Sequence, residues 1–264
     1  MWIDTHTHLD ASEFQNDLDQ IMARARTHQV NQFVIPAVHP NNFDAVRQLA
    51  HALPGAVYCL GIHPLYVQQC SLSDLVHLED TLKQHHHDPK LAAVGEIGLD
   101  GFIANPNWEK QIQFYHAQLK LAKQLNYPVV LHVRKAQDKI LQGLRRFPPQ
   151  SGIAHAFNGS TQQAHQFIQQ GIKLGFGGAL TYQRANQIRR LVCELPLNHI
   201  VLETDSPDIP PAWLSQQRNE PMHIAQIAQV IADLRHIDLT VVQQQTNQNA
   251  YDALPALRHS NHSP

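Results

Sequence analysis

Short apolar runs alternate along the chain with longer segments in which apolar residues recur at helical spacing. The short runs are rich in Val and Ile, which is typical of buried strands. They predict strands at Met1–His8, Gln32–Ala37, Ala56–Gly61, Leu91–Glu96, Pro128–His132, Gly152–His155, Ile172–Gly175 and His199–Glu203. The longer segments predict helices at about 13–28, 41–52, 73–86, 107–125, 136–146, 161–170, 184–194 and 220–236.

This order of elements predicts a parallel sheet, because each crossover between parallel strands needs about a helix's length of chain. For 264 residues, the closed (β/α)8 TIM barrel is the most economical arrangement. A doubly wound open sheet is the alternative, but no glycine-rich dinucleotide fingerprint follows the first strand. We expect a single hydrolase domain at 1–256, with 237–256 as a ninth helix packed on the outside, and a polar, frayed tail at 257–264.

Composition and charge limit the partners that the chain can bind. The chain is 43% hydrophobic, enough for a sizeable core, and its formal net charge of −2 creates no overall positive field that would attract nucleic acid. The N-terminus MWIDTHTH lacks a signal-peptide pattern, and no apolar run approaches the roughly 20 residues of a membrane helix. Three isolated cysteines fit free thiols in a reducing compartment. We therefore expect a cytoplasmic monomer that does not bind membranes.

Histidines and carboxylates repeatedly follow the predicted strands. His6 and His8 lie two positions apart, which would point both rings to the same side of a strand. In a chain with 19 histidines, such a pair arises by chance about once, so the pair alone is a weak motif. Metal-binding residue types also stand at the ends of other predicted strands, namely His63, Glu96, His132, His155 and Asp205.

The predicted barrel gives these residues a common place, because the C-terminal ends of all its strands meet at one mouth. Glu96 and Asp205 directly follow apolar residues. A carboxylate is costly to bury unless it is paired or bound to a cation. The sequence therefore predicts a metal site at the mouth.

Seven segments carry a family resemblance that covers almost the whole chain, from Ile3 to about Tyr251. In chain order they are DTHTHLD, GIHP, GEIGLD, LHVRKA, HAFNGS, ETDSPD and RNEP. Together they resemble the TatD family of metal-dependent deoxyribonucleases. The resemblance implies a TIM-barrel metallohydrolase of the amidohydrolase type, with DNA as the substrate of several members.

The resemblance also implies two divalent cations and assigns their ligands. One cation would be held by His6, His8, Glu96 and Asp205, and the other by Glu96, His132 and His155, so that Glu96 bridges them. Imidazole and carboxylate ligands suit Mg, Mn or Zn and do not choose among them.

Such a site predicts hydrolysis of DNA phosphodiester bonds by a metal-activated water. We expect Asp205 and Glu96 to be catalytic, with Asp205 orienting or deprotonating that water. Arg134 and His63 are the expected phosphate contacts. Glu203 and Asp4 are expected to support the ligands from below. Single-stranded DNA or 3′ ends are the expected substrate, with 3′–5′ exonuclease or endonuclease action left open.

Four positions depart from the family's usual pattern. Thr7 stands where many relatives have Cys, Leu65 where they have a second His, Ser206 where they have Ala, and Asp208 where they have a bulky residue. We expect Thr7 to point away from the metals, whereas Leu65 removes a phosphate contact and Asp208 alters the rim. Two other functions remain open: hydrolysis of a cyclic amide, ester or lactone by the same metals, and a non-catalytic metal-binding scaffold.

Overall fold

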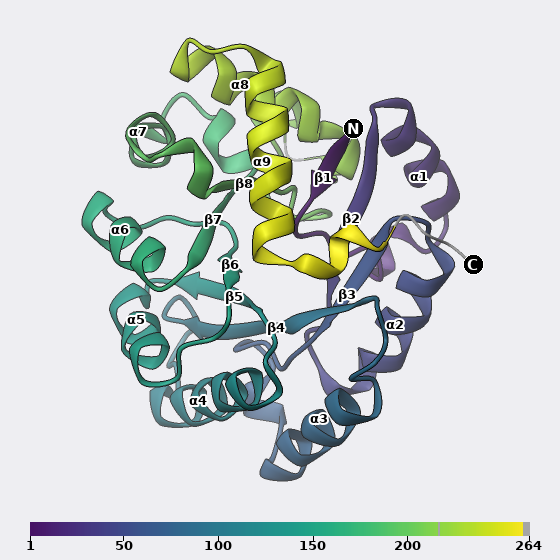
Figure 1. Ribbon diagram of the computed structural model, residues 1–264, viewed down its shortest axis with the longest axis vertical. Helices are drawn as coiled ribbons and strands as arrows, with labels where there is room; N and C mark the ends of the chain where they lie inside the picture. Colours follow the sequence, from purple (N-terminus) through teal and green to yellow (C-terminus); the bar gives the residue numbers. More distant parts are fainter. Residues whose placement is uncertain (216, 261–264) are drawn as a thin grey trace.

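The computed structural model describes residues 1–215 and 217–260 as a barrel of eight parallel strands that follow one another in chain order (Figure 1). The strands are β1 (Trp2–Asp4), β2 (Val30–Pro36), β3 (Ala56–Leu60), β4 (Leu91–Asp100), β5 (Val129–Arg134), β6 (Gly152–Ala154), β7 (Ile172–Phe176) and β8 (Ile200–Leu202). The α-helices are α1 (Leu18–Thr27), α2 (Phe43–Ala52), α3 (Leu72–Gln84), α4 (Trp108–Leu125), α5 (Gln137–Arg146), α6 (Thr161–Gln169), α7 (Asn186–Glu194), α8 (Ile224–Arg235) and α9 (Leu239–Ala253). The predicted (β/α)8 TIM barrel is confirmed.

Short 3-10 helices complete the connections. They are η1 (Ser12–Phe14), η2 (Pro40–Asn42), η3 (Val67–Gln69), η4 (Gly178–Thr181), η5 (Leu197–His199), η6 (Ala212–Leu214), η7 (Pro221–His223) and η8 (Pro255–Arg258). Within the described ranges, no helix is long and apolar enough to cross a membrane.

The barrel closes through backbone contacts just beyond the ends of β1 and β8. The Thr5 N–H donates to the Leu202 carbonyl at 3.0 Å, and the Asp205 N–H donates to the His6 carbonyl at 2.9 Å. Because this seam runs through His6 and Asp205, the closure of the sheet also fixes the backbone positions of these two residues.

The strand ends at the mouth differ from the prediction by one or two residues, except at β1 and β4, where they differ by four. β1 stops at Asp4 rather than His8, because the residues after it bond alternately to β2 and to the segment after β8. β8 likewise stops one residue before Glu203. β4 instead continues past Glu96 to Asp100, since Gly98 and Asp100 still pair with β5.

Two apolar cores stabilise the barrel. One lies between the strands and the surrounding helices, and the other fills the interior of the barrel. The interior core also contains residues of α9 and of the segment after it, namely Ala250, Ala253, Leu254 and Leu257. α9 therefore lies across one end of the barrel (Figure 1), and the expectation that it packs on the outside is wrong. The apolar residues at the N-terminal ends of the strands must be shielded from water, and the helices around the outside of the barrel do not shield them.

The first residues of the predicted tail pack against the barrel. Leu257 and Ser260 are buried, and the Gln32 amide donates to the Leu257 carbonyl and the Ser260 hydroxyl. The expected frayed segment therefore does not begin at residue 257, because these contacts bind it to β2. The remaining residues of that prediction, 261–264, lie outside the described ranges.

Leu254→Ala is expected to lower the free energy of unfolding by about 2–5 kcal/mol, because it leaves a cavity in the interior core. Val241→Ala changes an exposed residue of α9 and is expected to stay within about 0.5 kcal/mol of the wild type. Urea denaturation followed by circular dichroism measures both. Equal stability of the two variants would show that α9 does not close the barrel.

Candidate metal centre

An open cavity of about 1420 Å³ lies at the C-terminal ends of the strands. Most of the predicted site residues line it, namely His8, His63, Glu96, His132, Arg134, His155 and Asp205. The other three, Asp4, His6 and Glu203, are fully buried. Side chains from positions throughout the chain therefore gather at one mouth.

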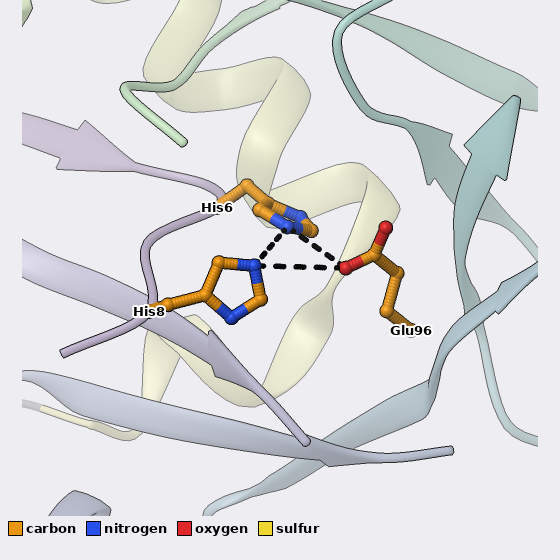
Figure 2. Close-up of side chains that lie close together, drawn as sticks. All are labelled: His6, His8 and Glu96. Atoms are coloured by element: carbon orange, nitrogen blue, oxygen red, sulfur yellow. Dashed lines mark hydrogen bonds and ion pairs between the residues drawn. The ribbon is translucent and has the colours of Figure 1, made fainter. Parts of the chain in front are cut away.

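One group of ligand atoms surrounds a carboxylate oxygen of Glu96 (Figure 2). The Nε2 atoms of His6 and His8 lie 3.3 Å apart, at 3.2 and 3.7 Å from Glu96 Oε2. Asp205 Oδ1 lies 3.5 Å from His6 Nε2 and 3.6 Å from His8 Nε2. Both histidines come after the end of β1, so the expected placement of both on a regular strand is wrong. Their rings meet because the seam with the segment after β8 holds this stretch in place.

A second group surrounds the other oxygen of Glu96. Glu96 Oε1 lies 3.2 Å from His63 Nε2, 2.9 Å from His132 Nδ1 and 2.8 Å from His155 Nε2. Glu96 itself is only 1% exposed. Burial would raise its pKa, but His155, His63 and His6 hold that pKa well below its ordinary value. Glu96 is thus an ionised carboxylate with histidine nitrogens at both oxygens.

The ring of His132 shows that these groups suit a cation. Its Nε2 lies 3.1 Å from Asp100 Oδ2, and a carboxylate only accepts, so the network assigns the ring proton to Nε2. Nδ1 faces Glu96 Oε1 at 2.9 Å and His155 Nε2 at 3.2 Å. Burial would lower the pKa of His132, but the hydrogen bonds to Asp100 and Glu96 raise it above its ordinary value. Acceptors that converge in this way require a positive charge between them.

The pKa of His155 reflects the same requirement. Burial alone would lower it, but the facing Glu96 carboxylate raises it to about 10. A proton on His155 is one source of this positive charge, and a divalent cation would be another. Three sets of residues bring their ligand atoms close enough to hold a metal ion: His6, His8 and Glu96; His6, His155 and Asp205; and His63, Glu96 and His132.

His63 differs from the other histidines because its Nδ1 accepts the Leu65 N–H at 3.2 Å. This hydrogen bond assigns the ring proton to Nε2, the atom that faces Glu96. Burial lowers the pKa of His63 to about 4, so the ring is neutral. His63 therefore presents an N–H donor to the site, and it lies deeper than a rim contact.

Asp4 joins the first and last strands directly beside the ligands. Its carboxylate accepts the His6 N–H at 3.3 Å, and the Thr204 N–H and hydroxyl at 3.0 and 2.6 Å. Asn219, from the RNEP segment, donates its side-chain amide to the Thr204 carbonyl at 2.8 Å and to the Asp208 carbonyl at 3.1 Å. These bonds hold the backbone on both sides of Asp205, whose φ of +55° is left-handed.

Glu203 lies beside His155, with its Oε1 at 3.9 Å from His155 Nδ1. The same oxygen accepts the Ala156 N–H. Burial raises the pKa of Glu203 to about 8. Gly175 leaves the space for this carboxylate, since a Cβ at that position would collide with Glu203 Oε2.

Asp100 is a further residue of the site that was not predicted from the sequence. Its carboxylate contacts His132 and also accepts the Phe102 N–H at 2.6 Å. The sequence feature that could have predicted its role is its spacing, because Asp100 lies two positions after Gly98 and four after Glu96. In a strand that continues past Glu96, this spacing puts all three residues on one face.

Two glutamines of α4 were missed as well. Gln111 bonds the backbone N–H and carbonyl of Asp100, and Gln118 bonds those of Ile62, next to His63. Both are buried, and their spacing of seven residues marks one helix face. Glutamines at core-facing positions of a helix are the sequence feature that could have predicted these bonds to the backbone of Asp100 and Ile62.

The four departures from the family pattern fall into two places. Thr7 and Ser206 hydrogen-bond to each other through their hydroxyls at 2.8 Å, across the seam that closes the barrel. Leu65 and Asp208 both line the open cavity and are exposed. Arg134 also lies at the rim, where 54% of its side chain is exposed, rather than among the metal-ligand candidates.

The fold and this site define a class: (β/α)8 hydrolases whose ligands for divalent metals stand at the C-terminal mouth of the barrel. The sequence model of the TatD-related DNase family matches residues 3–254. The chain therefore belongs to the TatD family. This membership makes the protein a metal-dependent hydrolase, of the class that acts on ester bonds.

Individual relatives agree with this membership. The crystal structure of YjjV, a TatD homologue from Escherichia coli, superposes with a TM-score of 0.92 at 37% identity, covering 96% of this chain and 98% of that one. Human deoxyribonuclease TATDN3 is 34% identical over 97% of this chain and 96% of its own length. A 3′-5′ ssDNA/RNA exonuclease TatD from Erwinia billingiae is 30% identical over 94% and 96%.

Asp100→Asn is expected to weaken the affinity for Mn²⁺ by about 10- to 100-fold, because the amide no longer fixes the proton on His132 Nε2. Titration calorimetry on chelator-treated protein measures the affinity. Asp208→Asn removes an exposed carboxylate of the same cavity and serves as the matched control. Equal affinities of the two variants would contradict a supporting role for Asp100.

Proposed function

We propose that the protein is a deoxyribonuclease that hydrolyses phosphodiester bonds with two divalent cations, Mg, Mn or Zn. The observation that carries this proposal is the division of the Glu96 carboxylate between two groups of histidines. Human TATDN3 is named a deoxyribonuclease, and the Erwinia relative an exonuclease of single-stranded DNA and RNA.

The proposed ligands follow the two groups. His6, His8 and Asp205 would hold one cation with Glu96 Oε2, and His132 and His155 would hold the other with Glu96 Oε1. When bound, the two cations would lower the pKa of water and stabilise negative charge on a phosphorus centre. Together with two carboxylates they leave about two positive charges, which would attract an anion locally although the whole chain is slightly negative.

Asp205 is the proposed acceptor of the proton from the attacking water. Its Oδ1 faces the Nε2 atoms of both His6 and His8, and its side chain is 13% exposed to the cavity. Burial raises the pKa of Asp205, which makes it a better base than an ordinary aspartate. The bonds of Asp4 and Asn219 to Thr204 would hold Asp205 in position for this step.

Two further residues would contact the substrate. The neutral His63 can donate its Nε2–H to a phosphate oxygen or to the leaving oxygen. Arg134 stands at the rim with an exposed guanidinium, and this group can hold a phosphate oxygen through two N–H bonds. Glu203 would orient His155 through the nearby Nδ1.

Single-stranded DNA or a free 3′ end, degraded in the 3′–5′ direction, is the proposed substrate. The cavity is open and wide, and the name of the Erwinia relative supports this direction. We further propose that the chain acts as a monomer in the cytoplasm.

Asp205→Asn is expected to lower kcat on single-stranded DNA by at least about 100-fold, because the amide cannot accept the proton. The test uses 3′- and 5′-labelled oligonucleotides with Mg²⁺ or Mn²⁺, resolved on denaturing gels. Asp208→Asn is the control and is expected to lose no activity, since removing an exposed carboxylate cannot weaken the attraction for a polyanion. The two labels separate 3′–5′ from 5′–3′ degradation.

A chelator is expected to abolish activity in the same assay. Degradation that survives the chelator, or full activity of Asp205→Asn, would overturn the proposed function. Turnover of lactones or cyclic amides but not of DNA would show that the substrates are carbonyl compounds rather than phosphodiesters.

Metal content tests the two-cation assignment directly. The wild-type protein is expected to hold two Mn²⁺ ions per chain, whereas His8→Ala and His132→Ala each lose one, because each histidine belongs to a different group around Glu96. Inductively coupled plasma mass spectrometry after gel filtration measures the ratio. A single ion in the wild type, or loss of both ions in each variant, would contradict two separable sites.

A further inference from the structure

An exposed aromatic side chain lines the cavity beside two positively charged side chains at its rim. Phe102, in the loop between β4 and α4, is 57% exposed and lines the cavity with Arg134 and Lys135. The Arg134 guanidinium carbon lies 4.2 Å from the centroid of the Phe102 ring, and Lys135 Nζ lies 4.4 Å from it.

The local sequence holds Phe102 in this place. The Gly101 N–H donates to the Arg134 carbonyl at 2.7 Å. A Cβ at Gly101 would lie 2.8 Å from the Lys135 carbonyl oxygen, so only glycine lets the loop approach β5 this closely. Asp100 then accepts the Phe102 N–H at 2.6 Å and, through its other oxygen, contacts His132. The position of the ring is thus tied to a residue of the metal centre.

The opposite rim of the cavity has the opposite charge. Asp10, Glu13 and Asp208 line it there, on the loops that follow β1 and β8. In the circular order of strands, β1 and β8 lie across the barrel from β4 and β5. A polyanion that reaches the metals would therefore extend over the β4–β5 side.

We propose that Phe102, Arg134 and Lys135 form a subsite for the nucleotide next to the bond that is cleaved; this inference rests on the proposed function. The face of Phe102 would stack on a base, and the two cations would hold the adjoining phosphates. Both cations are at the ends of long, exposed side chains, so they can turn from the ring to phosphate oxygens when a base occupies it. Combined stacking and charge is the usual way to bind single strands.

The chemistry of this subsite selects an unpaired nucleotide. A base offers its face to a protein ring only when it is not stacked inside a duplex. The subsite would therefore make the protein discriminate against double-stranded ends.

Phe102→Ala is expected to raise KM for a single-stranded oligonucleotide about tenfold with little change in kcat, and Phe102→Trp is expected to restore the wild-type KM. Leu65→Ala removes another exposed apolar residue of the same cavity and is the matched control, with KM expected to stay unchanged. Bis(4-nitrophenyl) phosphate, which has no neighbouring base, is expected to be hydrolysed equally by all four proteins.

A binding measurement keeps the inference separate from catalysis. Fluorescence anisotropy of a labelled ten-nucleotide single strand with chelator-treated protein is expected to show about tenfold weaker binding by Phe102→Ala than by Leu65→Ala. Equal binding and equal KM for these two variants would overturn the subsite. If the wild type hydrolyses neither substrate, the proposed function fails, and the binding measurement alone then decides the subsite.

Discussion

The rest of the mouth depends on one buried charge, the carboxylate of Glu96. It is almost inaccessible to solvent and has three histidine nitrogens within 3.2 Å of Oε1 and two within 3.7 Å of Oε2. A charge in such a place is stable only if positive charge and hydrogen bonds surround it. The closed barrel provides these, because it brings the ends of strands from all around its mouth to Glu96 on β4.

Three other buried acidic side chains lie beside the candidate metal ligands. Asp4, Asp100 and Glu203 each accept a backbone N–H and each adjoin one histidine segment of the site. Every one of them is anchored by the backbone of a different strand end. The candidate ligand side chains are therefore held close to the same elements that close and extend the sheet.

The sequence predicted the barrel and the gathering of the histidines well, because apolar runs mark the strands and parallel strands share one mouth. Contacts that depend on distant partners could not be predicted in the same way. The extension of β4 to Asp100 depends on its pairing with β5 and on Gln111 of α4. The place of α9 was missed because an amphipathic helix does not encode which apolar surface it covers.

The two carboxylate oxygens of Asp100 connect the candidate metal ligand His132 with the rim of the cavity. One contacts His132 and the other holds the backbone of Phe102. By thermodynamic reciprocity, a ligand at the rim that strengthened the second bond and a cation at His132 would change each other's affinity by the same factor. A single carboxylate would thus couple binding at the rim of the cavity to binding of a cation at His132.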